Sequence, residues 1–249
     1  MSIIETEALV LRNYNISEAD KLVLFLTRKH GIVRGVARGA KRLKSRFGSC
    51  LEPFSQILLT YKQKEHHELV SVRQTELYKS NFELVSEPEK LLTYYYLSEL
   101  LQEFAPPNEP NELLFRMSVA CLSSVNEKLE KVETIVSYFE VWLLKISGYL
   151  PNFKHCGKCQ KNLLIEETSF LDTDLKHLCQ NCLKTRSFLQ VTGEQRIRLM
   201  LIQKKSPVDF RQIIAEQGFD YSEISKLSRI IIKQILGRDF GYWNREISV

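Results

Sequence analysis

The sequence predicts an α+β protein of more than one domain, in which a small β-barrel is followed by an α-helical body with an inserted four-cysteine module. Three observations support this prediction. Strand-like runs separated by turn residues fill the first eighty residues, and apolar residues then recur at helical spacing. Two CxxC pairs interrupt the helical region. The chain of 249 residues is long enough for two domains, each with its own core.

The first eighty residues contain five strand signals. Gly31, Gly35 and Gly39 recur every fourth residue, and glycine within a strand often marks the bulges and bends that a closed barrel requires. Five strands in a segment of this length favour an oligonucleotide-binding (OB) type barrel. The expected strands are Thr6–Tyr14, Lys21–Thr27, Gly31–Ala40, Phe54–Lys62 and Glu68–Tyr78.

The period of the apolar residues becomes helical at Pro88. Leu97, Leu100, Leu101 and Phe104 lie on one face of a first helix, which Pro106-Pro107 ends. Further helices are expected from about Pro110 to Val125, from Val132 to Ser147 before Gly148, after Thr192, and from Ser222 to a stop before Gly237.

The start of the fourth helix is marked by a capping box, Thr192-Gly-Glu-Gln195. This helix is expected to end before Pro207. The last helix places Ile224, Leu227, Ile231 and Ile235 on one side. We therefore expect an OB domain over residues 1–80 and a helical domain over residues 81–249, with a zinc-binding module at about 152–188.

The positive charge of the chain is concentrated at its beginning. Residues 1–80 contain fourteen basic and eight acidic residues, a net charge of +6, whereas the rest contains twenty-one and twenty-two, a net charge of −1. Such asymmetry indicates one electrostatically specialised domain joined to a nearly neutral body.

The sequence shows no secretory or membrane signal. Its start lacks a basic n-region and an apolar h-region, and no apolar run approaches the length of a membrane span. We expect a soluble cytoplasmic protein without a membrane partner, whose six cysteines are thiols or metal thiolates rather than disulfides.

One stretch, Lys21 to Leu51, holds nine basic residues and no acid. Its cations alternate with apolar strand-like sequence and glycines, so they belong to a folded surface rather than to a polar tail. The alternative is an ordinary solvated face, but such faces normally include compensating acids. The stretch therefore predicts a polyanionic partner, bound with strong salt dependence and little sequence preference.

Aromatic residues near this stretch are candidates for stacking on bases. Tyr14, Phe25, Phe54 and Tyr61 are expected mostly in the core, whereas Phe47, between Arg46 and Gly48, is expected to be exposed. The Tyr94-Tyr95-Tyr96 run lies within a helical pattern and is interpreted as core or interface.

The most specific local motif is a cysteine quartet, in which nineteen residues separate Cys156-Gly-Lys-Cys159 from Cys179-Gln-Asn-Cys182. This spacing is typical of a four-thiolate zinc site. Four protein ligands leave no position for water, so we predict one structural zinc ion rather than a catalytic one. A redox dithiol and unliganded cysteines are the alternatives.

The remaining cysteines and the histidines next to the quartet are not expected to be metal ligands. His155 and His177 adjoin the quartet but are not needed as ligands, and Cys50 and Cys121 are interpreted as apolar fillers. The chain contains no nucleophile elbow, phosphate loop, HExxH pair or DxD-type carboxylate pair. We therefore expect no enzymatic activity and no small-molecule substrate.

These residues together resemble the bacterial RecO recombination mediator family. The resemblance is collinear over most of the first domain and extends to the rest chiefly through the order of elements. The family's usual short basic final segment is replaced by Gly237–Arg245. The matching motifs are Ala8-Leu-Val-Leu-Arg12, Ser17-Glu-Ala-Asp20, Leu24-Phe-Leu-Thr-Arg28, His30-Gly31, Val36-Ala-Arg-Gly-Ala-Lys-Arg42, Ser45-Arg46 and Leu51-Glu-Pro-Phe54.

The resemblance implies a non-enzymatic role in DNA repair and homologous recombination at the bacterial nucleoid. It implies binding to single- and double-stranded DNA, annealing of complementary strands, and loading of RecA, together with RecR, on DNA coated by single-stranded DNA-binding protein. That protein's acidic C-terminal tail is expected to dock on the helical domain. The residues to which DNA contact is carried over are Arg28, Arg34, Arg38, Lys41, Arg42, Lys44 and Arg46.

Two other classes of function share features of this sequence. An RNA- or ribosome-associated OB and zinc-ribbon protein would bind phosphates in the same way, and comparison of DNA with RNA strands separates it from a DNA-binding protein. A zinc-dependent hydrolase requires an open metal position, which four cysteine ligands do not leave.

Overall fold

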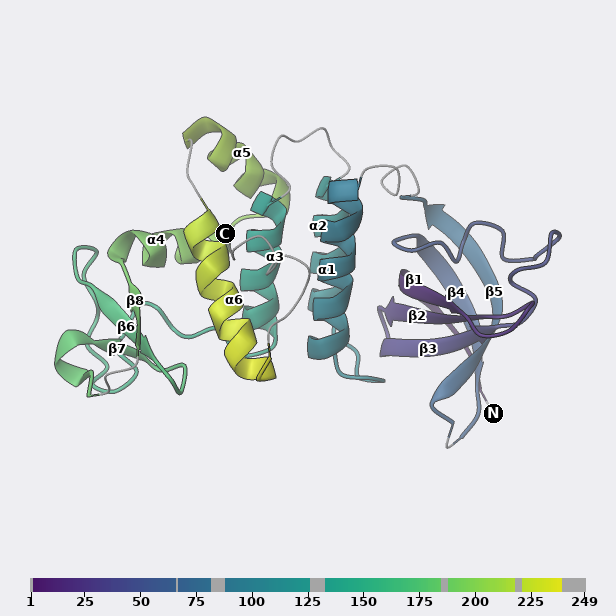
Figure 1. Cartoon of the computed structure of the whole chain (residues 1–249), viewed down its shortest axis with the longest axis horizontal. Coiled ribbons are helices and arrows are strands. Elements are labelled where there is room, and N and C mark those ends of the chain that lie inside the picture. Colours follow the sequence, from purple (N-terminus) through teal and green to yellow (C-terminus); the bar gives the residue numbers. More distant parts are fainter. Residues whose placement is uncertain are drawn as a thin grey trace. The chain divides into compact units, whose positions relative to one another are not determined.

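The computed structural model describes residues 2–65, 67–81, 88–125, 133–184, 188–217 and 221–238. The chain divides into two compact units, residues 1–132 and residues 133–249 (Figure 1). The predicted domain boundary at residue 80 falls within the first unit and stays a prediction. No described helix has the length and apolar character needed to cross a membrane.

The first unit begins with the predicted barrel, and the structure confirms its five strands. They pair in the order β1-β2-β3-β5-β4, and the pairing of β1 with both β2 and β4 closes the sheet. All neighbours are antiparallel except β3 and β5, which are parallel. The strands are β1 (Ser2–Asn15), β2 (Lys21–Thr27), β3 (Gly31–Ala37), β4 (Gln56–Gln63) and β5 (Leu69–Lys79).

Two glycines of β3 are required by close packing. A Cβ atom at Gly35 would lie 2.7 Å from Cγ2 of Val72, inside the barrel. At Gly31, where φ is +57°, a Cβ atom would lie 2.2 Å from the backbone oxygen of Glu109. Both positions exclude any larger residue, which explains part of the glycine repeat.

The segment between β3 and β4 is longer than the sequence predicts. β3 ends at Ala37 rather than Ala40, because Gly39 adopts a φ of +74° and takes the chain out of the strand. The N–H of Gly39 donates to Asp20 at 2.8 Å and holds this turn against the β1–β2 connection. Residues 38–55, which we call the basic loop, then fold as successive turns before β4 begins at Gln56.

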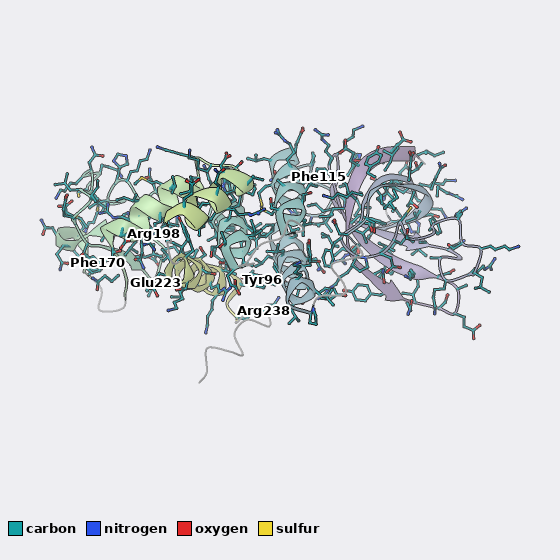
Figure 2. The ribbon with its side chains drawn as sticks, turned by 90° about the horizontal axis from the view of Figure 1, so that it is seen from above. Tyr96, Phe115, Phe170, Arg198, Glu223 and Arg238 are labelled. Atoms are coloured by element: carbon teal, nitrogen blue, oxygen red, sulfur yellow. The ribbon has the colours of Figure 1, made fainter. Side chains whose placement is uncertain are left out.

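Two helices complete the first unit, α1 (Pro88–Phe104) and α2 (Glu112–Val125). Ser98 of α1 donates to the carbonyl oxygen of Leu11 in β1, and Tyr94 donates to the carbonyl oxygen of Leu122 in α2. Tyr94 and Tyr96 are buried, as the sequence predicts for this tyrosine run. Figure 2 marks Tyr96 on α1 and Phe115, also buried, on α2.

The second unit contains α3 (Glu133–Ile146), α4 (Gly193–Ile202), α5 (Pro207–Gln217) and α6 (Ser222–Leu236), with α3 packed against the other three. The capping box at Thr192 and Gln195 is confirmed. The predicted stops at Gly148 and Gly237 are also confirmed, since both adopt positive φ values at helix ends.

Helix α5 was not predicted from the sequence. Pro207 was interpreted only as lying beyond the end of α4, yet it begins a new helix, where its missing N–H and its fixed φ are favourable. Ser206 accepts a hydrogen bond from the N–H of Asp209 at 3.1 Å and caps this start. The Ser-Pro-Val-Asp sequence was the available signal.

A small sheet was also missed. The strands β6 (Ser169–Asp172), β7 (His177–Cys179) and β8 (Phe188–Val191) form a sheet in the order β7-β6-β8. These strands are too short to show a clear alternation in sequence. Figure 2 marks Phe170, a buried residue of β6.

Candidate functional site

The basic loop concentrates cations at one end of the barrel. Arg38, Lys41, Arg42, Lys44 and Arg46 are all exposed. Arg34, on β3, is exposed as well. The structure thus places six of the seven predicted DNA-contacting residues on β3 and on the loop that follows it (Figure 1).

The basic loop is tied to the barrel along its length. The N–H of Lys41 donates to the carbonyl oxygen of Ala19 at 3.0 Å, and Asn13 donates to the carbonyl oxygen of Leu51 at 2.7 Å. Near its end, Phe54 and Val10 are joined by a backbone hydrogen bond of 2.7 Å. These bonds hold the cations on a defined surface.

The seventh predicted residue, Arg28, has a different environment. Its guanidinium pairs with Glu7 at 2.9 Å and with Glu112 at 2.5 Å. The hydrogen bonds that Arg28 donates to Glu112 and Glu7 raise the pKa of Arg28, and the same pairing lowers the pKa of Glu112. Arg28 therefore already has two carboxylate partners from outside the basic stretch.

The remaining cations differ in how they are held. Within the described part of the chain, Arg34, Arg38, Arg42 and Lys44 form no ion pair. Lys41 donates from Nζ to the carbonyl oxygen of Ser17 at 3.1 Å. Because these positive charges lack acidic partners there, they are the ones best placed to meet an external anion.

The prediction that Phe47 is exposed was wrong. Its side chain is only 1% exposed and lies in the barrel core, together with the nearby Leu51. Burial of this aromatic ring anchors the basic loop, and the guanidinium of Arg46 lies over the ring at 4.9 Å. Phe47 is thus a support for the cations and not a stacking platform for bases.

The four predicted cysteines converge in the second unit. The Sγ atoms of Cys156, Cys159, Cys179 and Cys182 all lie within 4.8 Å of one another, and those of Cys159 and Cys179 are 3.8 Å apart. A tetrahedral site with Zn–S bonds of about 2.3 Å separates its sulfurs by about 3.8 Å. The residues present therefore fit a metal ion with the coordination of Zn²⁺.

Two turns aim the sulfurs at this point. The N–H of Gln160 donates to the carbonyl oxygen of Cys156 at 2.9 Å, and the N–H of Leu183 donates to that of Cys179 at 3.2 Å. The N–H of Gly157 also donates to the carbonyl oxygen of His177, the first residue of β7, at 2.7 Å. The turn at residues 156–160, which we call the knuckle, is therefore joined to the strand that leads into the second turn.

The thiols differ in acidity. Burial disfavours the thiolate of Cys156, but hydrogen bonds from the N–H groups of Cys159, Cys179 and Lys158 outweigh it and lower the pKa to about 6. Burial and the adjacent cysteines raise the pKa of Cys182 to about 12. Four thiolates this close repel one another, so a bound cation is needed to deprotonate the whole set.

The neighbouring histidines have structural surroundings. Nδ1 of His177 lies 3.2 Å from the carbonyl oxygen of Asn152 and 3.1 Å from that of His155, and Nε2 lies 2.7 Å from the hydroxyl of Ser169. Its ring packs edge-on against Phe153. His177 therefore joins the knuckle to β6.

The two isolated cysteines are distinct from the quartet. Cys121 is fully buried, and its burial raises the pKa of the thiol, which agrees with an apolar filler. Cys50 is only partly buried and packs against the barrel core.

Comparison with known proteins identifies the chain's relatives. The family model "Recombination protein O N terminal" matches residues 1–81, and "Recombination protein O C terminal" matches residues 85–239. The chain belongs to the RecO family. Members of this family that resemble it include the DNA repair protein RecO of Geobacter metallireducens, 33% identical over 180 residues, which cover 71% of each chain.

For two further RecO proteins, the share of the chain that the match covers differs. The DNA repair protein RecO of Thermoanaerobacter sp. is 26% identical over 241 residues, 96% of this chain and 95% of the relative. That of Koribacter versatilis is 33% identical over 159 residues, and the match spans only 64% of either chain.

Proposed function

We propose that this RecO-family chain is a DNA repair and recombination protein that binds single- and double-stranded DNA through its basic loop. Its relatives are named DNA repair proteins. The observation that carries the proposal is the set of exposed cations on β3 and on the anchored basic loop, of which Arg34, Arg38, Arg42 and Lys44 form no ion pair among the described residues. Lys41 and Arg46 complete the surface, whereas Arg28 contributes only if its carboxylate partners are displaced.

We infer that the same surface promotes annealing of complementary strands. Annealing is opposed by repulsion between phosphates, and a dense cationic surface screens this repulsion and raises the local concentration of strands. No catalytic residue is required for such a role. In the cell, the protein would act with RecR to load RecA recombinase on DNA coated by single-stranded DNA-binding protein.

The DNA-binding surface is tested by reversing three charges, Arg38→Glu, Lys41→Glu and Arg42→Glu. All three side chains are exposed, so the fold should be retained. Binding to a fluorescent single strand should be lost at moderate salt, and the log–log salt slope should fall by about 2, from about 0.7 for each phosphate contact.

The matched control reverses Lys64, Lys204 and Lys205, three exposed lysines outside the basic stretch. It changes the net charge by the same amount and should bind nearly as the unmodified protein does. Equal affinity of the two triple variants would reject the assignment of the surface to the basic loop.

Annealing is measured with two complementary oligonucleotides across a salt titration. Acceleration that fades steeply as salt rises supports a mediator that acts through its cations. If binding occurs without acceleration at any salt, the protein is a nucleic-acid-binding module only. Tighter binding to a matched RNA strand than to DNA would favour the RNA-associated alternative.

We also propose that the cysteine quartet holds one structural zinc ion. Cys156, Cys159, Cys179 and Cys182 would be its ligands, and the bound cation would supply the cohesion that a knuckle with little apolar core lacks. Since four thiolates fill the coordination sphere, the chain's role stays non-enzymatic in this proposal.

For the acidic tail of single-stranded DNA-binding protein we propose a cavity in the second unit. Its volume is about 210 Å³, and Phe153, Leu163, Ile165, Ile197 and Met200 supply apolar lining next to Lys154 and Arg196. Such a cavity suits a peptide end that is both apolar and negatively charged. A tail peptide should bind the unmodified protein and should bind an Ile197→Glu, Lys154→Glu variant much more weakly, as measured by fluorescence anisotropy.

A further inference from the structure

Leu43 is the most exposed large apolar side chain among the described residues, at 108% of its reference accessibility. It lies in the basic loop between Arg42 and Lys44, which are also exposed. No part of the described structure covers this leucine. Exposure of an apolar side chain to water is unfavourable, so burial against a partner would stabilise the complex.

Single exposed apolar residues are common, and exposure by itself indicates no function. Leu43 differs because the chain is fixed by hydrogen bonds or buried side chains both before and after it. The N–H of Arg42 donates to Gly39 and that of Ser45 donates to Arg42, so Leu43 occupies a hydrogen-bonded turn. Lys41 bonds to Ala19 and Ser17, and Phe47 is buried in the barrel core.

We infer that Leu43 is an apolar wedge that packs against the terminal base pair at a junction between single-stranded and duplex DNA. Arg42 and Lys44, on either side of it, would contact the phosphates that flank the junction. This inference rests on the proposed DNA binding by the basic loop and assigns a preferred DNA structure to that surface.

The choice of a junction follows from the opposing energies. Proteins that insert leucine or a similar residue between stacked bases must first separate those bases. Burial of one leucine side chain is of the same order as the cost of unstacking one base step, so insertion into an intact duplex brings little net gain. At a junction the terminal pair is already unstacked on one side, and burial of the leucine is then favourable.

The inference is tested with the whole chain of 249 residues and two DNA probes of equal length. One is a closed circular duplex, which has no terminal pair, and the other is the same circle with a single-stranded gap and 2-aminopurine in the pair that borders the gap. The unmodified protein should bind the gapped probe about tenfold more tightly than the closed one. The fluorescence of 2-aminopurine, which reports base stacking, should change on binding.

The variants separate the wedge from the cations. Leu43→Ala should lose the preference for the gapped probe and the fluorescence change, yet bind a plain single strand within about twofold of the unmodified protein. Leu43→Phe should restore the preference, because a larger apolar face also stacks on the pair. The control variant is Leu164→Ala, which removes an exposed leucine of the second unit. It should change neither the preference between the probes nor the fluorescence response.

Each result has a defined meaning. If Leu43→Ala keeps the preference and the fluorescence change, or if the unmodified protein binds both probes equally, the wedge is rejected while DNA binding by the loop stands. If the unmodified protein binds no DNA even at low salt, the proposed function itself is rejected.

Discussion

Single residues decide how the basic loop is presented. Phe47, with its ring in the barrel core, holds Arg46 beside it and leaves the neighbouring cations in solvent. At Arg28, by contrast, two carboxylates from distant positions in the sequence already neutralise the charge. Arg46 therefore keeps its charge available at the surface, whereas the charge of Arg28, eighteen residues earlier, is already paired. The difference lies in the side chains that fold beside each arginine.

The contribution of Phe47 is measurable as stability. Phe47→Ala removes a fully buried aromatic ring and should lower the free energy of unfolding by about 3 to 5 kcal/mol. Phe47→Leu, which keeps most of the apolar volume, should cost much less. Urea unfolding followed by circular dichroism measures both, and similar values for the two variants would contradict the role of the ring as an anchor.

A second residue of consequence is Glu140, which is fully buried in α3. Ser225 donates to it at 2.8 Å and Nε of Arg229 at 3.0 Å, both from α6. Glu140→Gln keeps the shape of the side chain but removes the charge, and it should cost about 2 to 3 kcal/mol, because a buried ionic pair is broken on one side.

The control for this variant is Glu223→Gln. Glu223 lies in the first turn of α6 (Figure 2) and pairs with Lys226 in solvent, so the change should cost less than about 1 kcal/mol. Trp142 lies on α3 in the second unit, and its emission during urea unfolding reports on that unit. Equal losses in the two variants would show that the buried pair contributes no more than an exposed one.

At the scale of elements, ends of helices were easier to predict than short strands. The capping box of α4 satisfies two backbone N–H groups reciprocally, since each of Thr192 and Gln195 accepts with its side-chain oxygen from the N–H of the other. Its signal is contained in four consecutive residues. The strands β6 to β8 have three or four residues each and depend on pairing with one another, which a local pattern does not encode.

The cap of α4 gives a prediction at this scale. Thr192→Ala removes the hydroxyl that accepts from the N–H of Gln195 and should cost about 1 kcal/mol of stability. Thr192→Ser keeps the hydroxyl and should be nearly neutral. Tryptophan emission in urea measures both, and an Ala variant as stable as the Ser variant would mean that the cap contributes nothing to α4.

At the scale of the whole molecule, the chain is two compact units with different chemistry. The first contains the barrel and the basic loop, and the second contains the cysteine quartet. Loss of a structural metal should therefore act on one unit much more than on the other.

Metal removal tests this separation. A strong chelator, or Cys179→Ser, should release zinc and lower the midpoint of unfolding followed by tryptophan emission in the second unit. Binding of single-stranded DNA at low salt should change little, since the basic loop belongs to the first unit. A metal-replete, fully stable Cys179→Ser variant would count against the zinc proposal.

The sequence by itself determined the barrel strands, most helices, the cysteine quartet and the place of the positive charge. These features depend on period, spacing and composition, which are local properties of the chain. The tertiary structure decided that Phe47 faces the core, that the last three residues of the predicted third strand belong to a loop, and that Glu7 and Glu112 neutralise Arg28. Each of these depends on residues that are distant in sequence and adjacent in space, and side-chain burial and Coulomb attraction act through space rather than along the chain.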